Sequence, residues 1–204
     1  MIEDTTSKGE LTRQAITQAA YDLFVRQGYH GTSMRQIAES TGIALSGIYN
    51  HFAGKEAIFR SVIMTYHPFI SLMPLLENLE GDSAEELLRQ AAGLIVRQME
   101  EQHGLLNLLF IELIDLEGRH MAELVDHVLP YVLRFQQRIL ELENYQLRAE
   151  TPLTFFRSFM GFFIAYYAMN QLVAGTAAAR FDTLTIDDMM DIYLYGLFTK
   201  GDPS

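Results

Sequence analysis

The stretch from Thr32 to Glu56 constrains the fold more than any other part of the chain, because it has the pattern of a helix, a tight turn and a second helix. Ser33 and Gln36 have the spacing of a capping box, in which each side chain bonds the backbone N–H of the other residue. Gly42 stands where the first helix must end, since glycine adopts the left-handed conformation without steric cost. The capping box and the glycine at the helix end together predict a helix–turn–helix motif.

The second helix of this motif has one apolar face. Ile43, Ile48 and Phe52 recur at helical spacing and are expected to face inward. A second helix with an outward-facing surface fits the major groove of DNA. The side chains expected on that surface are Leu45, Ser46, Tyr49 and Asn50.

The rest of the chain also has a helical pattern, which predicts an all-α fold. The first helix is expected to start between Ser7 and Arg13 and to end at Gly28. Pro68 and Pro74 are expected to kink or end the helix that starts at residue 55, and proline at position 130 is expected to begin a new helix. The further helices are predicted over 34–40, 45–52, 83–102, 105–116, 119–128, 130–147, 152–174 and 187–198.

Charge is distributed unevenly along the chain, whose net charge is −11. Residues 1–60 carry six basic and six acidic residues, and the remainder carries nine basic and twenty acidic residues. A neutral N-terminal part is a weak electrostatic footprint for DNA, so binding is expected to rely on a few phosphate contacts and on the symmetry of a dimer.

Cellular context is indicated by two absences in the sequence. The chain has no cysteine, which excludes disulfides and thiolate chemistry. The sequence MIEDTTSKGE has neither the basic start nor the apolar run of a signal peptide, so a cytoplasmic location is expected. With 49% apolar residues, the chain has enough material for a substantial core.

Residues 10–60 resemble the tetracycline-repressor (TetR) family of bacterial regulators. The resemblance implies an N-terminal three-helix DNA-binding domain over 1–54 and a helical ligand-binding and dimerisation domain over 55–204. The positions that carry it are Ala15-Ile16, Ala19-Ala20, Leu23-Phe24, Gly28-Tyr29, Thr32-Ser33, Ile37-Ala38, Gly42-Ile43, Ile48-Tyr49, His51-Phe52 and Lys55-Glu56.

The resemblance also implies roles for individual residues of the motif. Tyr49 and Lys55 match positions that hold phosphates in the family, and Lys55 lies at a helix N-terminus that favours anions. An asparagine can pair with adenine, and a leucine can touch a thymine methyl group. The backbone contacts are further expected from Thr32, Ser33 and Arg35, and base contacts from Leu45, Ser46, Gly47, Asn50 and His51.

Two residues of the expected recognition helix depart from the family pattern. Ala44 occupies a cap position where serine or threonine is usual, which costs about 1 kcal/mol. Gly47 weakens the helix by roughly 0.5–1 kcal/mol relative to alanine, although it would let the backbone approach the bases closely. We therefore expect this helix to be soft in the free protein and to become firmer on DNA.

The stretch 158–179 contains no charged residue, and two interpretations are open for it. It is long enough to span a bilayer, which takes about 20 apolar residues. The favoured interpretation is a helix buried on all sides, because the resemblance implies a dimer interface built from the last two long helices, here 153–174 and 187–198.

A ligand site, if present, is expected between the helices of the second domain. Apolar and aromatic residues dominate the candidates and favour a largely apolar or aromatic effector. The candidates are Met99, His103, Phe110, Leu113, Ile114, His127, Tyr131, Phe159, Phe163, Tyr166 and Asn170.

Other polar clusters give weaker signals. His120, Glu123 and His127 share a helical face that could hold a metal, but a solvated face is the preferred interpretation. Glu112 and Asp115 lie in an apolar helix and need partners. The partners considered are a cationic ligand or one of the arginines Arg134, Arg138 and Arg157.

Together these features predict a ligand-responsive repressor that binds a palindromic DNA operator as a homodimer and needs no cofactor or metal. No nucleotide-binding loop, catalytic triad or zinc-protease motif is present in the sequence, so no enzyme activity is expected. The alternatives are a DNA-binding regulator that answers to a protein partner and, more remotely, a small helical enzyme or carrier.

Overall fold

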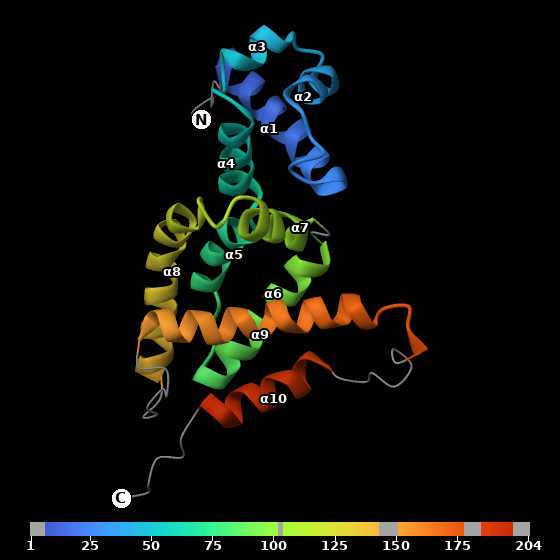
Figure 1. Cartoon of the computed structure of the whole chain (residues 1–204). Helices are drawn as coiled ribbons and strands as arrows, with labels where there is room; N and C mark the ends of the chain where they lie inside the picture. Colours follow the sequence, from blue (N-terminus) through green and yellow to red (C-terminus); the bar gives the residue numbers. More distant parts are fainter. Residues whose placement is uncertain (1–6, 102–103, 143–150, 178–184, 198–204) are drawn as a thin grey trace, which may run out of the picture. The chain divides into compact units, whose positions relative to one another are not determined.

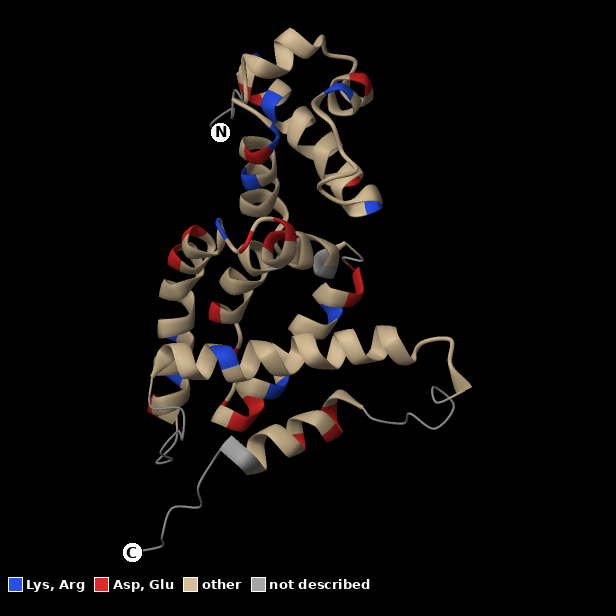
Figure 2. Cartoon of the chain, viewed as in Figure 1, with Lys and Arg blue, Asp and Glu red and all other residues tan. Residues whose placement is uncertain are grey.

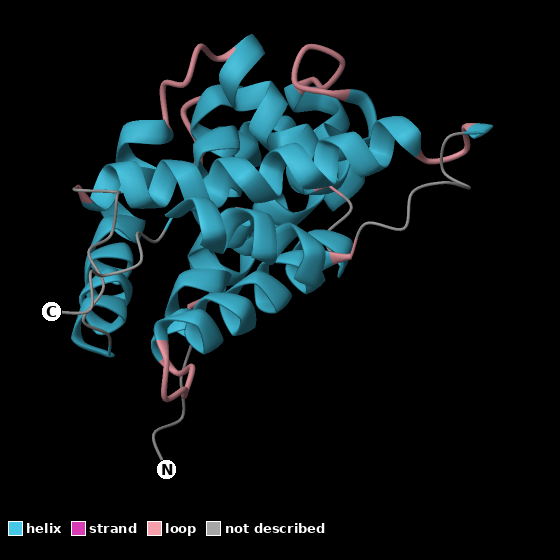
Figure 3. Cartoon of the chain, turned by 90° about the horizontal axis from the view of Figure 1, so that it is seen from below, coloured by secondary structure: helices cyan, strands magenta, loops and turns pink. Residues whose placement is uncertain are grey.

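The computed structural model describes residues 7–101, 104–142, 151–177 and 185–197 of the chain. Within these ranges all regular structure is helical (Figure 3), which confirms the predicted all-α class. The chain forms two compact units, which are described separately. The first comprises Met1–Ile70 and Gly104–Val125, and the second comprises Ser71–His103 and Asp126–Ser204.

The first unit contains the predicted helix–turn–helix (Figure 1). The Ser7 hydroxyl accepts from the Glu10 N–H at 3.2 Å, and Gly28 ends the first helix with a φ of 74°. Both ends were predicted from the sequence. The described helices of this unit are α1 (Lys8–Gln27), α2 (Met34–Thr41), α3 (Leu45–Tyr49), α4 (Lys55–Tyr66), α7 (Leu105–Phe110), a π-helical turn η1 (Ile111–Asp115) and the start of α8 (Met121–Leu142).

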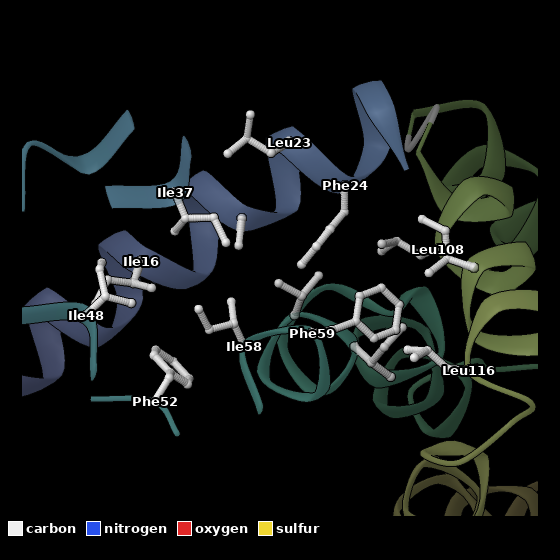
Figure 4. Packing of buried hydrophobic residues seen from close by; sticks show 14 of the residues in the cluster. Ile16, Leu23, Phe24, Ile37, Ile48, Phe52, Ile58, Phe59, Leu108 and Leu116 are labelled. Atoms are coloured by element: carbon white, nitrogen blue, oxygen red, sulfur yellow. The ribbon is translucent and has the colours of Figure 1, made fainter. Parts of the chain in front are cut away.

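One apolar core joins α1, α2, α3, α4, α7 and η1 (Figure 4). The rings of Phe24 in α1 and Phe59 in α4 meet edge to face at 5.2 Å between centroids. Leu108 and Leu116 add side chains from the distant segment. The compact unit extends beyond the expected boundary after residue 54, because α4 and the segment with Leu108, Ile111 and Leu116 bury apolar side chains in the same core.

The second unit consists of the remaining helices. Its elements are most of α5 (Pro68–Glu77), α6 (Ala84–Glu101), most of α8, α9 (Pro152–Val173) and α10 (Ile186–Leu197). In α9, the stacked rings of Phe155 and Phe159 are buried. The Tyr193 hydroxyl of α10 lies 3.0 Å from the Ser158 hydroxyl of α9, which links the last two described helices.

The prolines agree only partly with the expectation. The helix from residue 55 ends at Tyr66, just before Pro68, as expected, and Pro74 lies inside the next helix, α5. Pro130 lies inside a continuous α8 where the sequence predicted a break, so that prediction was wrong. A proline inside a helix costs about 3 kcal/mol. The helix continues because burial of its apolar stripe, which includes Val128, Val132 and Phe135, offsets that cost. The expected helix ends at 102, 147 and 198 lie outside the described residues.

Helix α3 is short and has no side-chain cap. Ala44 precedes it without a capping hydrogen bond, as the sequence predicted. A Cβ added to Gly47 would lie 2.8 Å from the Cγ2 atom of Ile43, a stiff β-branched neighbour. Glycine at this position is therefore required by packing within the motif, a reason that the sequence alone did not reveal.

His67 lies between α4 and α5 and is buried, with 1% of its surface exposed. Its Nδ1 atom accepts from the Phe69 N–H at 3.3 Å, so the neutral ring carries its proton on Nε2. Within the described residues, this Nε2 atom has no hydrogen-bond partner. Burial lowers the pKa of His67 from 6.5 to about 4.

Acidification should therefore destabilise the protein through His67. The unfolded chain takes up this proton near pH 6.5, whereas the folded chain resists it until about pH 4. The stabilisation is fully present above the unfolded pKa and is lost as the pH falls toward the folded one. Between pH 7 and pH 5 the wild type should lose on the order of 2 kcal/mol that His67→Phe retains. Urea unfolding at both pH values checks this, and identical losses in the two proteins would contradict it.

Replacing Gly47 by alanine should destabilise the protein, although alanine is the better helix former. The added methyl group must displace Ile43, and strain of this kind typically costs about 1–3 kcal/mol. Gly93→Ala in α6 is the matched control, because its Cβ would meet only the end of the Arg97 side chain at 4.0 Å. That variant should gain roughly 0.5–1 kcal/mol. Thermal unfolding of both variants decides, and a stabilising Gly47→Ala would refute the packing explanation.

Candidate nucleic-acid interface

The first helix of the motif is held by the predicted local contacts. The Gln36 N–H donates to the Ser33 hydroxyl at 3.2 Å, and the Ser33 N–H donates to the Gln36 side-chain oxygen at 2.8 Å. Gly42 ends the helix in the left-handed conformation with φ 69°. The turn is therefore set by the residues that the sequence indicated.

Helix α3 presents a solvent-exposed surface on one side and packs with the other. Ile48 is fully buried and Phe52 nearly so, whereas Leu45 is 38% and Tyr49 is 53% exposed. Two further predicted base-contacting residues, Ser46 and Asn50, are exposed beside them. The predicted division of this helix into inner and outer faces is therefore present.

The remaining motif residues differ in their exposure to solvent. Ser33, Arg35 and Ala44 are exposed, and Gly47 and His51 are half-buried. Thr32 is only 1% exposed, and its hydroxyl donates to the Gly28 carbonyl at 2.8 Å. Its side chain is thus committed to the loop between α1 and α2 and does not lie on the surface, as a backbone contact would need.

Lys55 is half-buried and its ammonium group points into the protein. Its Nζ donates to the carbonyl oxygens of Tyr29 at 2.7 Å and Thr32 at 2.8 Å, and lies 4.1 Å from the centroid of the Tyr29 ring. Burial lowers the pKa of Lys55, and the charge of Asp115 opposes this. Two of the three ammonium donors are therefore used within the protein. The sequence predicted a phosphate contact for Lys55 and did not indicate these internal hydrogen bonds.

Arg13 has a role that the sequence analysis did not identify. Its Nη1 donates to the His51 carbonyl at 2.8 Å, and its guanidinium lies 4.1 Å from the centroid of the Phe52 ring. The two segments are 38 residues apart, so no local pattern could indicate the contact. Arg13 ties the end of the recognition helix to α1.

Few cations of the first unit remain available for an external anion. Arg60 pairs with Glu123, and Arg119 pairs with Glu56 at 3.2 Å. The helix α3 carries no lysine or arginine (Figure 2). Among the described residues, the exposed Arg35 has no hydrogen-bond or ion-pair partner. Arg35 is accordingly the best-placed cation for a phosphate.

The two carboxylates of the apolar helix find partners different from those expected. Glu112 is fully buried and accepts from the His120 N–H at 2.6 Å, while its second oxygen lies 2.9 Å from the His120 Nδ1. The Asp115 carboxylate lies 3.8 Å from the His30 ring. The pairing with an arginine that was considered for Glu112 is therefore wrong, because its helix folds back onto the turn that contains His120.

The face containing His120, Glu123 and His127 shows no metal-site geometry. Glu123 is paired with Arg60, and His127 is exposed. No group of metal-ligating side chains occurs in the part of the chain that the structure describes. His120 is only 7% exposed, so the preferred interpretation of a solvated face was wrong for this residue.

A small cavity of about 130 Å³ lies between α6 and α9 in the second unit. Three predicted ligand residues, Met99, Tyr166 and Asn170, line it together with the polar side chains of Glu100 and Gln171. Ligand sites for drug-sized molecules usually measure about 300–1,000 Å³. The cavity therefore admits only a few heavy atoms in this conformation.

The other ligand candidates are not brought together with these residues. Phe159 and Phe163 are buried and meet edge to face at 5.0 Å, as core residues do. The His127 and Tyr131 rings lie 6.5 Å apart on α8. Three further candidates belong to the first unit and are exposed there, namely Phe110, Leu113 and Ile114. The last candidate, His103, lies outside the described residues.

The uncharged stretch from residue 158 does not form a membrane span. Helix α9 ends at Val173, and among the helices of the described ranges none has the length and hydropathy needed to cross a bilayer. Instead α9 exposes Leu153, Met169 and Leu172, and α10 exposes Ile192 and Tyr195.

Comparison with known proteins identifies the family of this motif. Residues 16–62 match the model of bacterial regulatory proteins of the tetR family. HTH-type transcriptional regulator UidR of Escherichia coli K12 is 33% identical over 64 residues, which are 31% of this chain and 33% of UidR. HTH-type transcriptional regulator SrpR of Pseudomonas putida is 36% identical over 69 residues, which are 33% of this chain and 32% of SrpR.

The match to these two relatives spans about a third of their length. The fold of the whole chain is similar to that of Salmonella enterica GusR, with a TM-score of 0.71 at 17% identity, covering 95% of this chain and 98% of GusR. UidR and SrpR are transcriptional regulators, which agrees with the expectation that the chain is not an enzyme. The N-terminal part of the chain, over residues 16–62, is therefore similar to the tetR family of bacterial regulatory proteins.

Proposed function

We propose that this protein is a transcriptional regulator that binds an operator in double-stranded DNA as a homodimer. The observation that carries the proposal is the exposed surface of α3, with Leu45, Ser46, Tyr49 and Asn50 outward while Ile48 is buried. A helix held in this way can enter the major groove. Two copies related by a twofold axis would read the two halves of a near-palindromic site.

Contacts with DNA divide into two kinds. Ser33 and Arg35, at the exposed start of α2, contact the backbone, and the free N–H groups there add to the attraction for phosphate. Base reading falls to the outward residues of α3, with Asn50 paired to an adenine and Leu45 against a thymine methyl group. The remaining members of the proposed surface are Ala44, Ser46, Gly47, Tyr49 and His51.

The dimer is proposed to form through α9 and α10. Both helices expose large apolar side chains, including Leu172 at 71% and Tyr195 at 82% exposure. Large exposed apolar side chains that gather into a patch are typical of protein–protein contacts. Pairing of these helices between two copies would bury that surface.

Regulation is proposed to come from a small, largely apolar or aromatic effector that lowers DNA affinity. Met99, Tyr166 and Asn170 line the cavity between α6 and α9 and supply an apolar and aromatic lining with polar groups. The effector would favour a conformation in which the two motifs misfit successive grooves. The break between α4 and α5 at His67 is the place where the chain can accommodate this movement.

The small size of the cavity is the reason for a second candidate mode of regulation. A volume of about 130 Å³ is small for a drug-sized effector, so a regulator that answers to a protein partner is the second proposal. Equal affinity of a ligand for the free and DNA-bound protein would exclude effector control, because a ligand shifts an equilibrium only by differential binding.

Selection of genomic fragments by the purified protein tests the main proposal. We expect recovery of a few near-palindromic sites whose half-sites lie about one helical turn apart. Failure to enrich any sequence, at low salt and with folded dimeric protein, would overturn it. The genes beside the recovered sites would then indicate which compounds to test as effectors.

Substitutions on the surface should separate base reading from backbone contact. Asn50→Ala should cost about 1–3 kcal/mol at one operator base pair and leave binding to unrelated DNA unchanged. Arg35→Gln should weaken binding to all sequences and reduce the salt dependence of log K by about 1. Fluorescence anisotropy with operator and scrambled duplexes measures both effects. An Asn50→Ala protein with unaltered base preference would contradict the assignment.

Charged substitutions on the last two helices should abolish the dimer. Leu172→Glu with Tyr195→Glu would place like charges at the proposed interface, and a monomer should result. Leu140→Glu on α8, at a position that is 46% exposed, is the matched control and should stay dimeric. Analytical ultracentrifugation distinguishes the two states. A dimeric double variant would place the interface elsewhere.

A further inference from the structure

The loop that precedes α2 is held together by side chains. The Thr32 hydroxyl donates to the Gly28 carbonyl at 2.8 Å, and the Gln27 amide donates to the Gly31 carbonyl at 2.8 Å. The Lys55 ammonium, from the first turn of α4, takes the two remaining inner carbonyls, of Tyr29 and Thr32. The next residue begins the capping box of α2, so Lys55 determines where that helix starts relative to α4.

The opposite end of the motif has a similar fastening. Arg13 in α1 donates to the carbonyl of His51, directly after α3, and covers the ring of Phe52. Without this contact, the C-terminal side of α3 would be held mainly by the burial of Ile48 and Phe52. These apolar contacts fix how deeply the helix sits, and the directional bond from Arg13 adds a restraint on its orientation.

Helix α3 needs such support because it is short and has no side-chain cap. It has five residues, and isolated helices of this length do not form. The Gly47 N–H donates to Ala44 at 2.7 Å and the Asn50 N–H donates to Gly47 at 3.2 Å, which are the tight three-residue closures of a single turn. Its orientation therefore depends on tertiary contacts at both ends of the motif.

The geometry points to Lys55 and Arg13 as positioning residues for DNA recognition and not as phosphate ligands. Each donates to a backbone carbonyl and lies against an aromatic ring, Lys55 half-buried and Arg13 on the surface, and thereby holds α2 or α3 in place. The inference rests on the proposed function and names how the reading surface is held.

Physical chemistry favours this role over a phosphate contact. If the Lys55 ammonium left its carbonyls for a phosphate, the carbonyl oxygen of the buried Thr32 would lose its charged donor, and that of Tyr29 would keep only the Thr32 N–H at 3.2 Å. A buried acceptor left without its partner is costly, so the ammonium stays where it is. An exposed Arg35 incurs no such loss and is the natural phosphate ligand.

The test uses variants that keep the charge. Lys55→Arg replaces a compact ammonium by a planar group that cannot occupy the same point between two carbonyls, and Arg13→Lys removes the flat surface that covers the Phe52 ring. Lys55→Met removes the charge, and Arg35→Gln is the matched control for a phosphate contact. Affinities for operator and for scrambled duplex are measured over a range of salt concentrations.

For positioning residues, the charge-retaining variants should lose roughly five- to thirtyfold in operator affinity. Their affinity for scrambled DNA should stay the same, so the ratio of the two falls. A partly unfolded sample would lower both affinities equally and leave that ratio unchanged. In Lys55→Met the slope of log K against the logarithm of the salt concentration should equal that of the wild type. In Arg35→Gln this slope should fall by about one, and the ratio of operator affinity to scrambled-DNA affinity should stay the same.

Hydrogen exchange of the DNA-free protein supplies an independent readout. Lys55→Met should exchange faster in residues 28–34, and Arg13→Lys should exchange faster in residues 44–52, while Arg35→Gln matches the wild type. A Lys55→Met protein with a reduced salt slope and unchanged exchange would overturn the inference. If the wild type binds no DNA, the proposed function fails, and the exchange data alone decide whether the two fastenings exist.

Discussion

Burial of Ile48 and Phe52 in the core of the first unit is the interaction on which the candidate DNA-binding surface depends. Each buried side chain of this size contributes about 1.5–3 kcal/mol. Helix α3, which contains Ile48, is too short to persist alone, so this burial both forms it and turns Asn50 and Tyr49 outward. Contacts from Arg13 and Lys55 then restrain its two ends. The reading surface is therefore a product of tertiary packing.

Electrostatics explains why orientation matters so much in this protein. The N-terminal sixty residues are neutral, and two of their cations, Arg13 and Lys55, already donate to backbone carbonyls. Non-specific attraction to DNA comes from phosphate neutralisation, so little of it is available here. Affinity must then come from base contacts, from a few backbone contacts such as that of Arg35, and from the simultaneous docking of two copies.

Residues 104–125 connect the motif to a part of the chain far away in sequence. Their apolar residues complete the core beside Phe24 and Phe59, and Arg60 pairs with Glu123. The buried Glu112 is satisfied by a backbone N–H and a ring nitrogen of one residue, His120, which closes the turn after η1. Because a buried carboxylate needs donors, this turn has one well-defined conformation.

The sequence by itself determined the local structure. The capping box at Ser33, the left-handed Gly42 and the apolar periodicity around Ile48 specify helices and turns through contacts within a few residues, and all were predicted. Tertiary structure alone decided what joins distant segments. That includes the continuity of α8 through Pro130, the steric need for glycine at 47, the burial of Thr32 and the inward turn of Lys55. These features depend on which surfaces meet in three dimensions. The spacing of residues along the chain does not indicate which distant segments contact each other.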